Sequence, residues 1–183
     1  PARPANPQRA RELGECVGID FSYHAMPNGK RFLVANFVCE ASRFHIGVVL
    51  KEAFCDNDEY LGNPDGDSVL EALQSNWLRC MLTPKRIHVD SDGVFTAGKL
   101  AEFCARRHIR TIVCGGEAHW QLGVVERHIG TFKDSLAKLM LEDCYGDLSG
   151  QEMVDMCLEA KNFNATHNGS SPANWMLGRQ HPL

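Results

Sequence analysis

Short β-branched runs alternate with amphipathic stretches along most of this chain, and this order constrains the fold more than any other feature. The alternation predicts strands at 15–23, 31–39, 45–50, 86–89 and 111–114. It predicts helices at about 67–80, from 96 onward, at 122–141 and at 151–163, with a loop that ends at 169–173. Three strands and a helix, followed by strand, helix, strand and helices, are typical of an α/β fold with a five-stranded mixed sheet.

The bulk properties are those of an ordinary soluble globular protein. A chain of 183 residues with 44% hydrophobic and 23% charged residues is expected to form one domain around one core. It has no apolar stretch of 18 residues, so we expect no membrane partner. Three prolines among the first seven residues predict an extended linker at 1–14 and a core at 15–183. The absence of an initial Met suggests an excised fragment.

The net charge of −4 argues against a surface that coats nucleic acid, which would normally be basic. The charge is uneven, because residues 51–71 are acidic whereas 106–110 and 127–128 are locally basic. The objection weakens if metal ions neutralise some carboxylates and if a neighbouring domain supplies the basic contacts.

Eight cysteines are scattered singly, with no CxxC pair and no zinc-finger spacing. Most have apolar neighbours, which predicts buried, reduced thiols. The eight histidines show no ligand pairing by spacing either.

The positions of three acidic residues are better explained by metal binding than by packing. Asp20 lies in the first predicted strand, Asp90 ends the fourth, and Glu126 lies at the start of a helix, with thirty-five residues between Asp90 and Glu126. Acids so placed can converge on two divalent ions about 3.5–4 Å apart, as phosphoryl transfer requires. Oxygen ligands favour Mg²⁺ or Mn²⁺ over Zn²⁺. Taken singly, each acid is more often a turn, capping or solvated helix residue.

Three longer motifs contain or follow these acids. They are IHVDSDGVF at 87–95, GEAHWQLGVVERHIGTFK at 116–133 and NFNATHNGSSPANWMLGR at 162–179. In this order the motifs resemble the integrase catalytic core of retroviruses and LTR retrotransposons, and their style is closer to retrotransposon polyproteins. The resemblance covers about 15–179 and implies a ribonuclease H-like fold.

The resemblance also implies a function. Asp20 is expected to bridge two Mg²⁺ or Mn²⁺ ions, with Asp90 and Glu126 holding one each. With water as nucleophile, such a core trims the 3′ ends of element DNA. With the freed 3′-hydroxyl, it joins those ends to target DNA. The implied partners are element and target DNA and a second copy of the chain, and the implied place of action is the nucleus, after a cytoplasmic particle.

The resemblance assigns a lysine that contacts the DNA end to Lys133, two helical turns after Glu126. Arg127 is a weaker phosphate contact. His119 and Trp120 could stack on an unpaired base. For Lys133 the ordinary alternative is an exposed lysine, and for His119 and Trp120 it is loop packing.

The chain departs from the family pattern in two places. One extra residue precedes the glycine of the second acid motif, so Asp92 competes with Asp90, which we prefer because it keeps the thirty-five-residue gap to Glu126. The interval from Asp20 to Asp90 is also long, which predicts a surface insertion at 55–68.

Two other functions remain open at the level of sequence. One is a ribonuclease H-type nuclease with the same metal site. The other is a decayed core that acts as a DNA- or protein-binding module. The zinc module and the basic C-terminal region usual in the family are not in this sequence, which implies an isolated core.

Overall fold

A five-stranded mixed sheet forms the centre of the molecule, as the sequence predicts. The computed structural model describes residues 12–54, 61–90, 93–95, 98–114, 123–142, 147–165 and 169–178. The strand order is β3-β2-β1-β4-β5. β1 pairs antiparallel with β2 and parallel with β4; β2–β3 is antiparallel and β4–β5 is parallel. The strands are β1 (Cys16–Ala25), β2 (Lys30–Cys39), β3 (His45–Phe54), β4 (Arg86–Asp90) and β5 (Arg110–Cys114).

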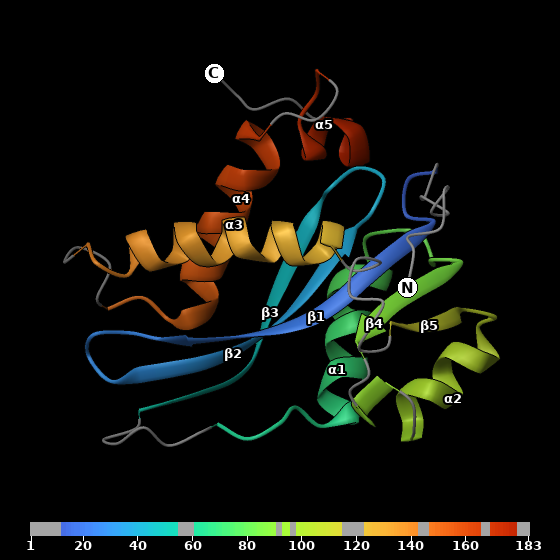
Figure 1. Ribbon diagram of the computed structural model, residues 1–183, viewed down its shortest axis with the longest axis horizontal. Coiled ribbons are helices and arrows are strands. Elements are labelled where there is room, and N and C mark those ends of the chain that lie inside the picture. The colour runs from blue at the N-terminus through green and yellow to red at the C-terminus, as the bar shows by residue number, and fades with distance from the viewer. Residues whose placement is uncertain are drawn as a thin grey trace, which may run out of the picture.

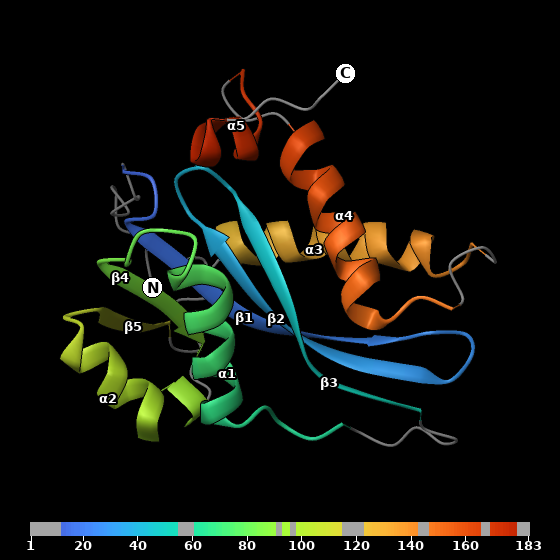
Figure 2. The ribbon, with the colours of Figure 1, turned by 180° about the vertical axis from the view of Figure 1, so that it is seen from behind.

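Helices cover both faces of this sheet. α3 and α4 lie on one face, and α1 and α2 lie on the other (Figures 1 and 2). No described helix is long and apolar enough to cross a membrane. The helices are α1 (Gly66–Ala72), continued by the π-helical turn η1 (Leu73–Leu78), the 3₁₀ turn η2 (Gly93–Phe95), α2 (Gly98–Arg106), α3 (Gly123–Leu139), α4 (Gly150–Asn164) and α5 (Pro172–Leu177).

The structure differs from the sequence prediction at two element ends and in one whole helix. β3 continues to Phe54 because its pairing with β2 extends to Lys30. The N-cap of α1 is Asp65, whose carboxylate accepts the backbone N–H of Ser68, and not residue 67 or 68. α5 forms where a loop was expected. Its signal was present in the sequence, since a serine N-cap followed by proline is a helix start.

Only part of the predicted insertion at 55–68 is described, since residues 55–60 lie outside the described ranges. Residues 66–68 form the start of α1 and not a loop.

The alternation of β1 divides the core between the two faces. Val17 and Ile19 belong to the larger cluster with α1 and α2, which also takes in Trp77 and Phe103. Residues of the opposite parity face α3 and α4, where Phe132 packs in a second cluster. Both clusters are built from fully or nearly fully buried side chains. A sheet with two covered faces explains why its central strands are apolar almost throughout.

Two glycines let the helices of one face approach the sheet closely. A Cβ on Gly18 of β1 would lie 2.0 Å from Cγ2 of Val125 in α3. A Cβ on Gly47 of β3 would lie 2.7 Å from Cγ1 of Val154 in α4. Any side chain at these positions would displace a helix, so the two glycines set how close α3 and α4 lie to the sheet.

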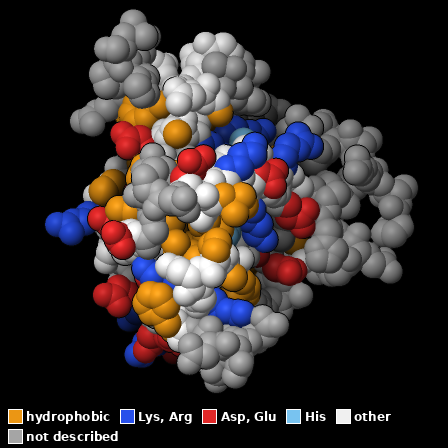
Figure 3. All heavy atoms as spheres, turned by 90° about the vertical axis from the view of Figure 1, so that its left-hand side faces the viewer, with side chains coloured by type: hydrophobic (Ala, Val, Ile, Leu, Met, Phe, Trp, Pro, Cys, Tyr) orange, Lys and Arg blue, Asp and Glu red, His pale blue; other side chains and the backbone are white. Residues whose placement is uncertain are grey.

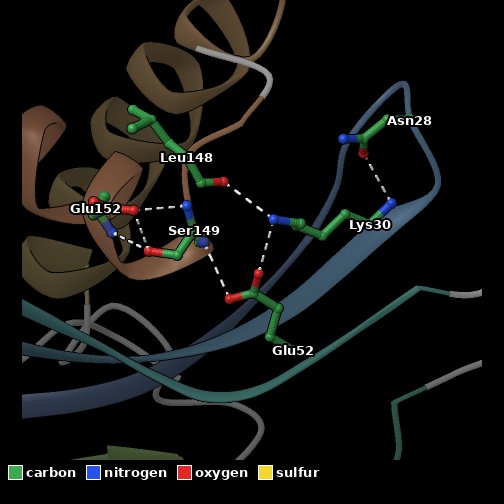
Figure 4. Close-up of polar contacts among 7 residues, drawn as sticks. Asn28, Lys30, Glu52, Leu148, Ser149 and Glu152 are labelled. Atoms are coloured by element: carbon green, nitrogen blue, oxygen red, sulfur yellow. Dashed lines mark hydrogen bonds and ion pairs between the residues drawn. The ribbon is translucent and has the colours of Figure 1, made fainter.

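Polar contacts fix the N-terminus of α4 to the β2–β3 edge (Figure 4). Lys30 forms an ion pair with Glu52 at 3.1 Å and donates to the carbonyl of Leu148 at 3.1 Å. The other oxygen of Glu52 accepts the backbone N–H of Gly150 at 3.1 Å. Ser149 and Glu152 complete a capping box. α4 is thereby anchored where it begins.

Candidate active site

The fold brings the three predicted acids to one region of the sheet. Asp20 lies in the middle of β1, and Asp90 is the last residue of β4. Because Ile19 pairs with Val89 in parallel register, the two aspartates that follow are neighbours on adjacent strands. Glu126 stands in the first turn of α3, next to the valine that packs on Gly18.

The three acids lie close enough for their charges to act on one another. Burial raises the pKa of Asp20, and the nearby carboxylates of Asp90 and Glu126 raise it further. The backbone N–H of Phe21, 2.8 Å from the Asp20 carboxylate, and the charge of Lys133 lower this pKa in part. Three carboxylates that repel one another favour binding of a cation.

The donor set fits a hard cation. Asp20 and Asp90 are half-buried and Glu126 is exposed, so the region is open to solvent on the α3 side. Carboxylate oxygens are the ligands that Mg²⁺ and Mn²⁺ prefer. Among the described residues, the carboxylate oxygens of Asp20, Asp90 and Glu126 do not all lie within 4.8 Å of one another. Metal binding therefore requires small side-chain movements.

Lys133 lies close enough to Asp20 for its charge to act there. Its charge acts on the carboxyl of Asp20 and on the ring of His24, although its side chain is exposed. Arg127 is exposed in the first half of α3, and its carbonyl accepts the hydroxyl of Thr131. Lys133 is therefore the cation best placed to act near the trio.

Three residues of the sequence hypothesis lie outside the described residues: Asp92, His119 and Trp120. The choice between Asp90 and Asp92, and the proposed base-stacking pair, stay predictions.

A buried row of polar side chains behind Asp20 was not foreseen from the sequence. The amide nitrogen of Asn36 donates to Ser22 Oγ at 3.0 Å and to the Asp20 carbonyl at 3.3 Å. Ser22 lies 2.8 Å from Nε2 of His24. The signal was Asn36 itself, a polar residue inside the apolar β2 run FLVANFVC.

The same row continues to α4 through His45, whose ring is fully buried. Its Nε2 lies 3.0 Å from Asn36 Oδ1, and its Nδ1 lies 3.3 Å from Nζ of Lys161. An ammonium can only donate, so Nδ1 accepts and Nε2 donates to Asn36. The side chain of Asn162 also brackets the backbone of His45, at 2.8 and 3.0 Å. The β1 segment that carries Asp20 is therefore tied by hydrogen bonds to α4.

Lys161 gives stability a pH dependence. Burial lowers the pKa of Lys161 from 10.5 to about 8, so between pH 8 and 10.5 the unfolded chain holds more protons than the folded one. Stability from this group therefore rises with pH across that window, by at most about 3 kcal/mol. We expect urea unfolding to show that the free energy of unfolding of wild type, relative to that of Lys161→Met, increases from pH 8 to 10.

Taking the difference between the two proteins removes the opposing effect of buried thiols such as Cys157, whose pKa burial raises to about 11. The matched control is Lys138→Met, an exposed lysine of α3, whose difference from wild type should stay flat. A flat difference for Lys161→Met as well would contradict the assignment.

The cysteine prediction is confirmed where the structure describes it. Five of the six described cysteines are buried and all six are free; Cys80 is exposed.

The sheet order and the helices on both faces define a ribonuclease H-like fold. No family profile matches the chain, and no curated protein matches its sequence. Solved structures do match it. A chain of the simian T-cell lymphotropic virus intasome, in complex with PP2A regulatory subunit B56 gamma, matches with a TM-score of 0.76 and 14% identity. That match covers 97% of this chain and 59% of the other, so this chain spans less than two thirds of the intasome protein.

Two catalytic cores match over nearly their full lengths. The HTLV-2 integrase catalytic core in complex with magnesium, in its dimeric form, has a TM-score of 0.64 and 18% identity over 91% of this chain and 97% of that one. The BIV integrase catalytic core has a TM-score of 0.63 and 20% identity over 90% and 95%. The chain therefore has the fold of a retroviral integrase catalytic core.

Proposed function

We propose that this chain is the catalytic core of a retrotransposon-type integrase, which trims the 3′ ends of element DNA and joins them to target DNA with divalent metal. The observation that carries the proposal is the convergence of Asp20, Asp90 and Glu126 on one region of this fold. Integrase cores with the same fold, one of them in complex with magnesium, support it.

The acids have distinct roles in this proposal. Asp20 would hold both ions, with Asp90 and Glu126 holding one each. When bound, Mg²⁺ or Mn²⁺ supplies activation of a water or 3′-hydroxyl and charge stabilisation at the phosphate. The protein would position these carboxylates on the sheet and on a helix that packs closely on Gly18, and side-chain rotation would complete the site.

DNA would enter on the exposed side of α3. Lys133 is the proposed phosphate contact beside the metal, with Arg127, His119 and Trp120 as further contacts. Figure 3 shows one side of the molecule, toward which the β1–β2 turn and the end of α3 point. Acidic and basic side chains surround an apolar area on this side. The described part of this side is not uniformly basic, so we expect DNA attraction to be local to α3.

We also propose that the chain acts as a homodimer or a higher oligomer on nuclear DNA. The HTLV-2 cores have dimeric and trimeric forms. In this chain α4 and α5 expose Met156, Trp175 and Leu177, apolar side chains that a second copy can cover.

The deciding experiment compares a labelled DNA duplex with an RNA–DNA hybrid of the same sequence, each with Mn²⁺, Mg²⁺ or EDTA. We expect metal-dependent cutting and joining of the DNA duplex. Cutting of only the RNA strand of the hybrid would instead indicate a ribonuclease H-type nuclease. Absence of any metal binding by calorimetry, with DNA present, would indicate a decayed binding module.

A further inference from the structure

A second group of ligand-type side chains lies beside the acid trio. Cys16 begins β1, Glu40 directly follows β2, and His88 lies in β4. These residues are neighbours because β1 pairs with both other strands, Cys39 being opposite Val17 and His88 opposite Gly18. One ligand atom from each lies within 4.8 Å of the others, and His88 Nδ1 is 2.5 Å from Glu40 Oε1.

The group is enclosed. Cys16 is 0% exposed, His88 8% and Glu40 9%. A buried carboxylate needs a compensating partner, and within this group only the imidazole and the thiol face it. Arg86, whose charge also reaches Cys16, forms an ion pair with Glu15 at 3.1 Å. The charge of Arg86 is thus shared with another carboxylate.

The donor types differ from those of the acid trio. A thiolate, an imidazole and a carboxylate are ligands of Zn²⁺, at about 2.3, 2.0–2.1 and 2.0–2.2 Å. Ligand atoms around a tetrahedral ion then lie about 3.3–3.8 Å apart. The three ligand atoms already lie within 4.8 Å of one another, and the 2.5 Å pair needs to open by about 1 Å to admit the ion.

We propose that Cys16, Glu40 and His88 form a Zn²⁺ site, with a water molecule in the fourth position, that holds β1, β2 and β4 together beside the acid trio. The Cys16 thiol loses its proton to solvent as the Zn–S bond forms. The proton between His88 and Glu40 moves to the ring nitrogen of His88 that does not bind the ion, so the imidazole binds as a neutral ligand and one proton is released per ion bound. The thiolate, the carboxylate and the dication sum to zero charge, which suits a buried site.

Without metal the three side chains form a hydrogen-bonded triad. Burial and the Glu40 carboxylate raise the pKa of the Cys16 thiol, which then stays protonated and bonds to Glu40. The metal-free triad is thus the state that the test must distinguish from the metal site.

Co²⁺ provides the test, because a cobalt–thiolate bond has its own charge-transfer absorption. The full chain is titrated with Co²⁺ in excess Mg²⁺, which fills oxygen-only sites but competes poorly for a thiolate. We expect one Co²⁺ per chain with thiolate absorption, displaced by one Zn²⁺. Cys16→Ala should lose the absorption and weaken Zn²⁺ binding by about 100-fold or more. Loss of a residue that only hydrogen-bonds to a ligand usually weakens metal binding by less than this.

Two controls separate this site from others. Cys104→Ala removes a buried thiol on the opposite face and should bind as wild type does. Asp20→Asn should leave the cobalt–thiolate absorption unchanged while weakening Mn²⁺ binding at the trio. Absence of thiolate absorption in the wild-type chain, a measurement that needs no variant to fold, would overturn the proposal and leave the hydrogen-bonded triad.

Discussion

Replacing Asp90 by Asn is expected to reduce metal-dependent DNA cutting and joining by about 10³-fold, because the metal supplies several kcal/mol of transition-state stabilisation. The exchange keeps the shape of the side chain and removes one charged ligand from the trio. Calorimetry with Mn²⁺ should show the loss directly, as weaker binding to the variant. Folding should be retained, since Asp90 is the half-buried last residue of its strand.

Two further variants make this result specific. Asp92→Asn tests the competing register, and we expect near-normal Mn²⁺ binding. Asp134→Asn removes one exposed carboxylate of α3 and controls for the overall change of charge. If Asp92→Asn abolished binding and Asp90→Asn did not, the second ligand would move to residue 92. If neither changed binding, the trio would not be the metal site.

The second large effect is expected at Gly18, which holds no ligand. Gly18→Ala places a methyl group 2.0 Å from Val125 Cγ2, so α3 must shift outward from β1. Overpacking of this kind costs about 3 kcal/mol of stability. The shift of α3 also moves Glu126, which follows Val125, away from Asp20. A displacement of about 1 Å can lower activity by about 10²-fold. Urea unfolding and Mn²⁺ affinity measure the two effects separately.

A rescue and a control sharpen this prediction. Val125→Ala removes the closest atom, so Gly18→Ala should cost less in that background than in wild type. Gly130→Ala lies in the same α3 with nothing within 4 Å of the new methyl group, and should be neutral or stabilising. Equal costs in both backgrounds would show that the contact with Val125 does not explain the glycine.

Much of the fold was predictable because local signals agreed. β-branched runs and amphipathic stretches gave the strands and the long helices within a few residues. The misses were at ends where side-chain capping decides, as at Asp65, and at α5, where six residues carry too little periodicity to stand out. The π-helical turn from Leu73 has no sequence signal that we can name.

The candidate site was predictable only in part. Spacing and motif order predicted Asp20, Asp90 and Glu126, and the structure places them close enough for their charges to interact. Spacing did not identify Asn36, His45 and Lys161, because their contact depends on three elements packing face to face. Nor could it bring Cys16, Glu40 and His88 together, since ligand-spacing rules assume neighbours along the chain.

The sequence by itself determined the strands, the long helices and their order, and with them the α/β class, because helix and strand periodicity are local properties. Only the tertiary structure decided which strands are neighbours and how close α3 lies to β1. Those choices depend on contacts between residues far apart in the chain, such as Gly18 with Val125, whose energies no local pattern encodes.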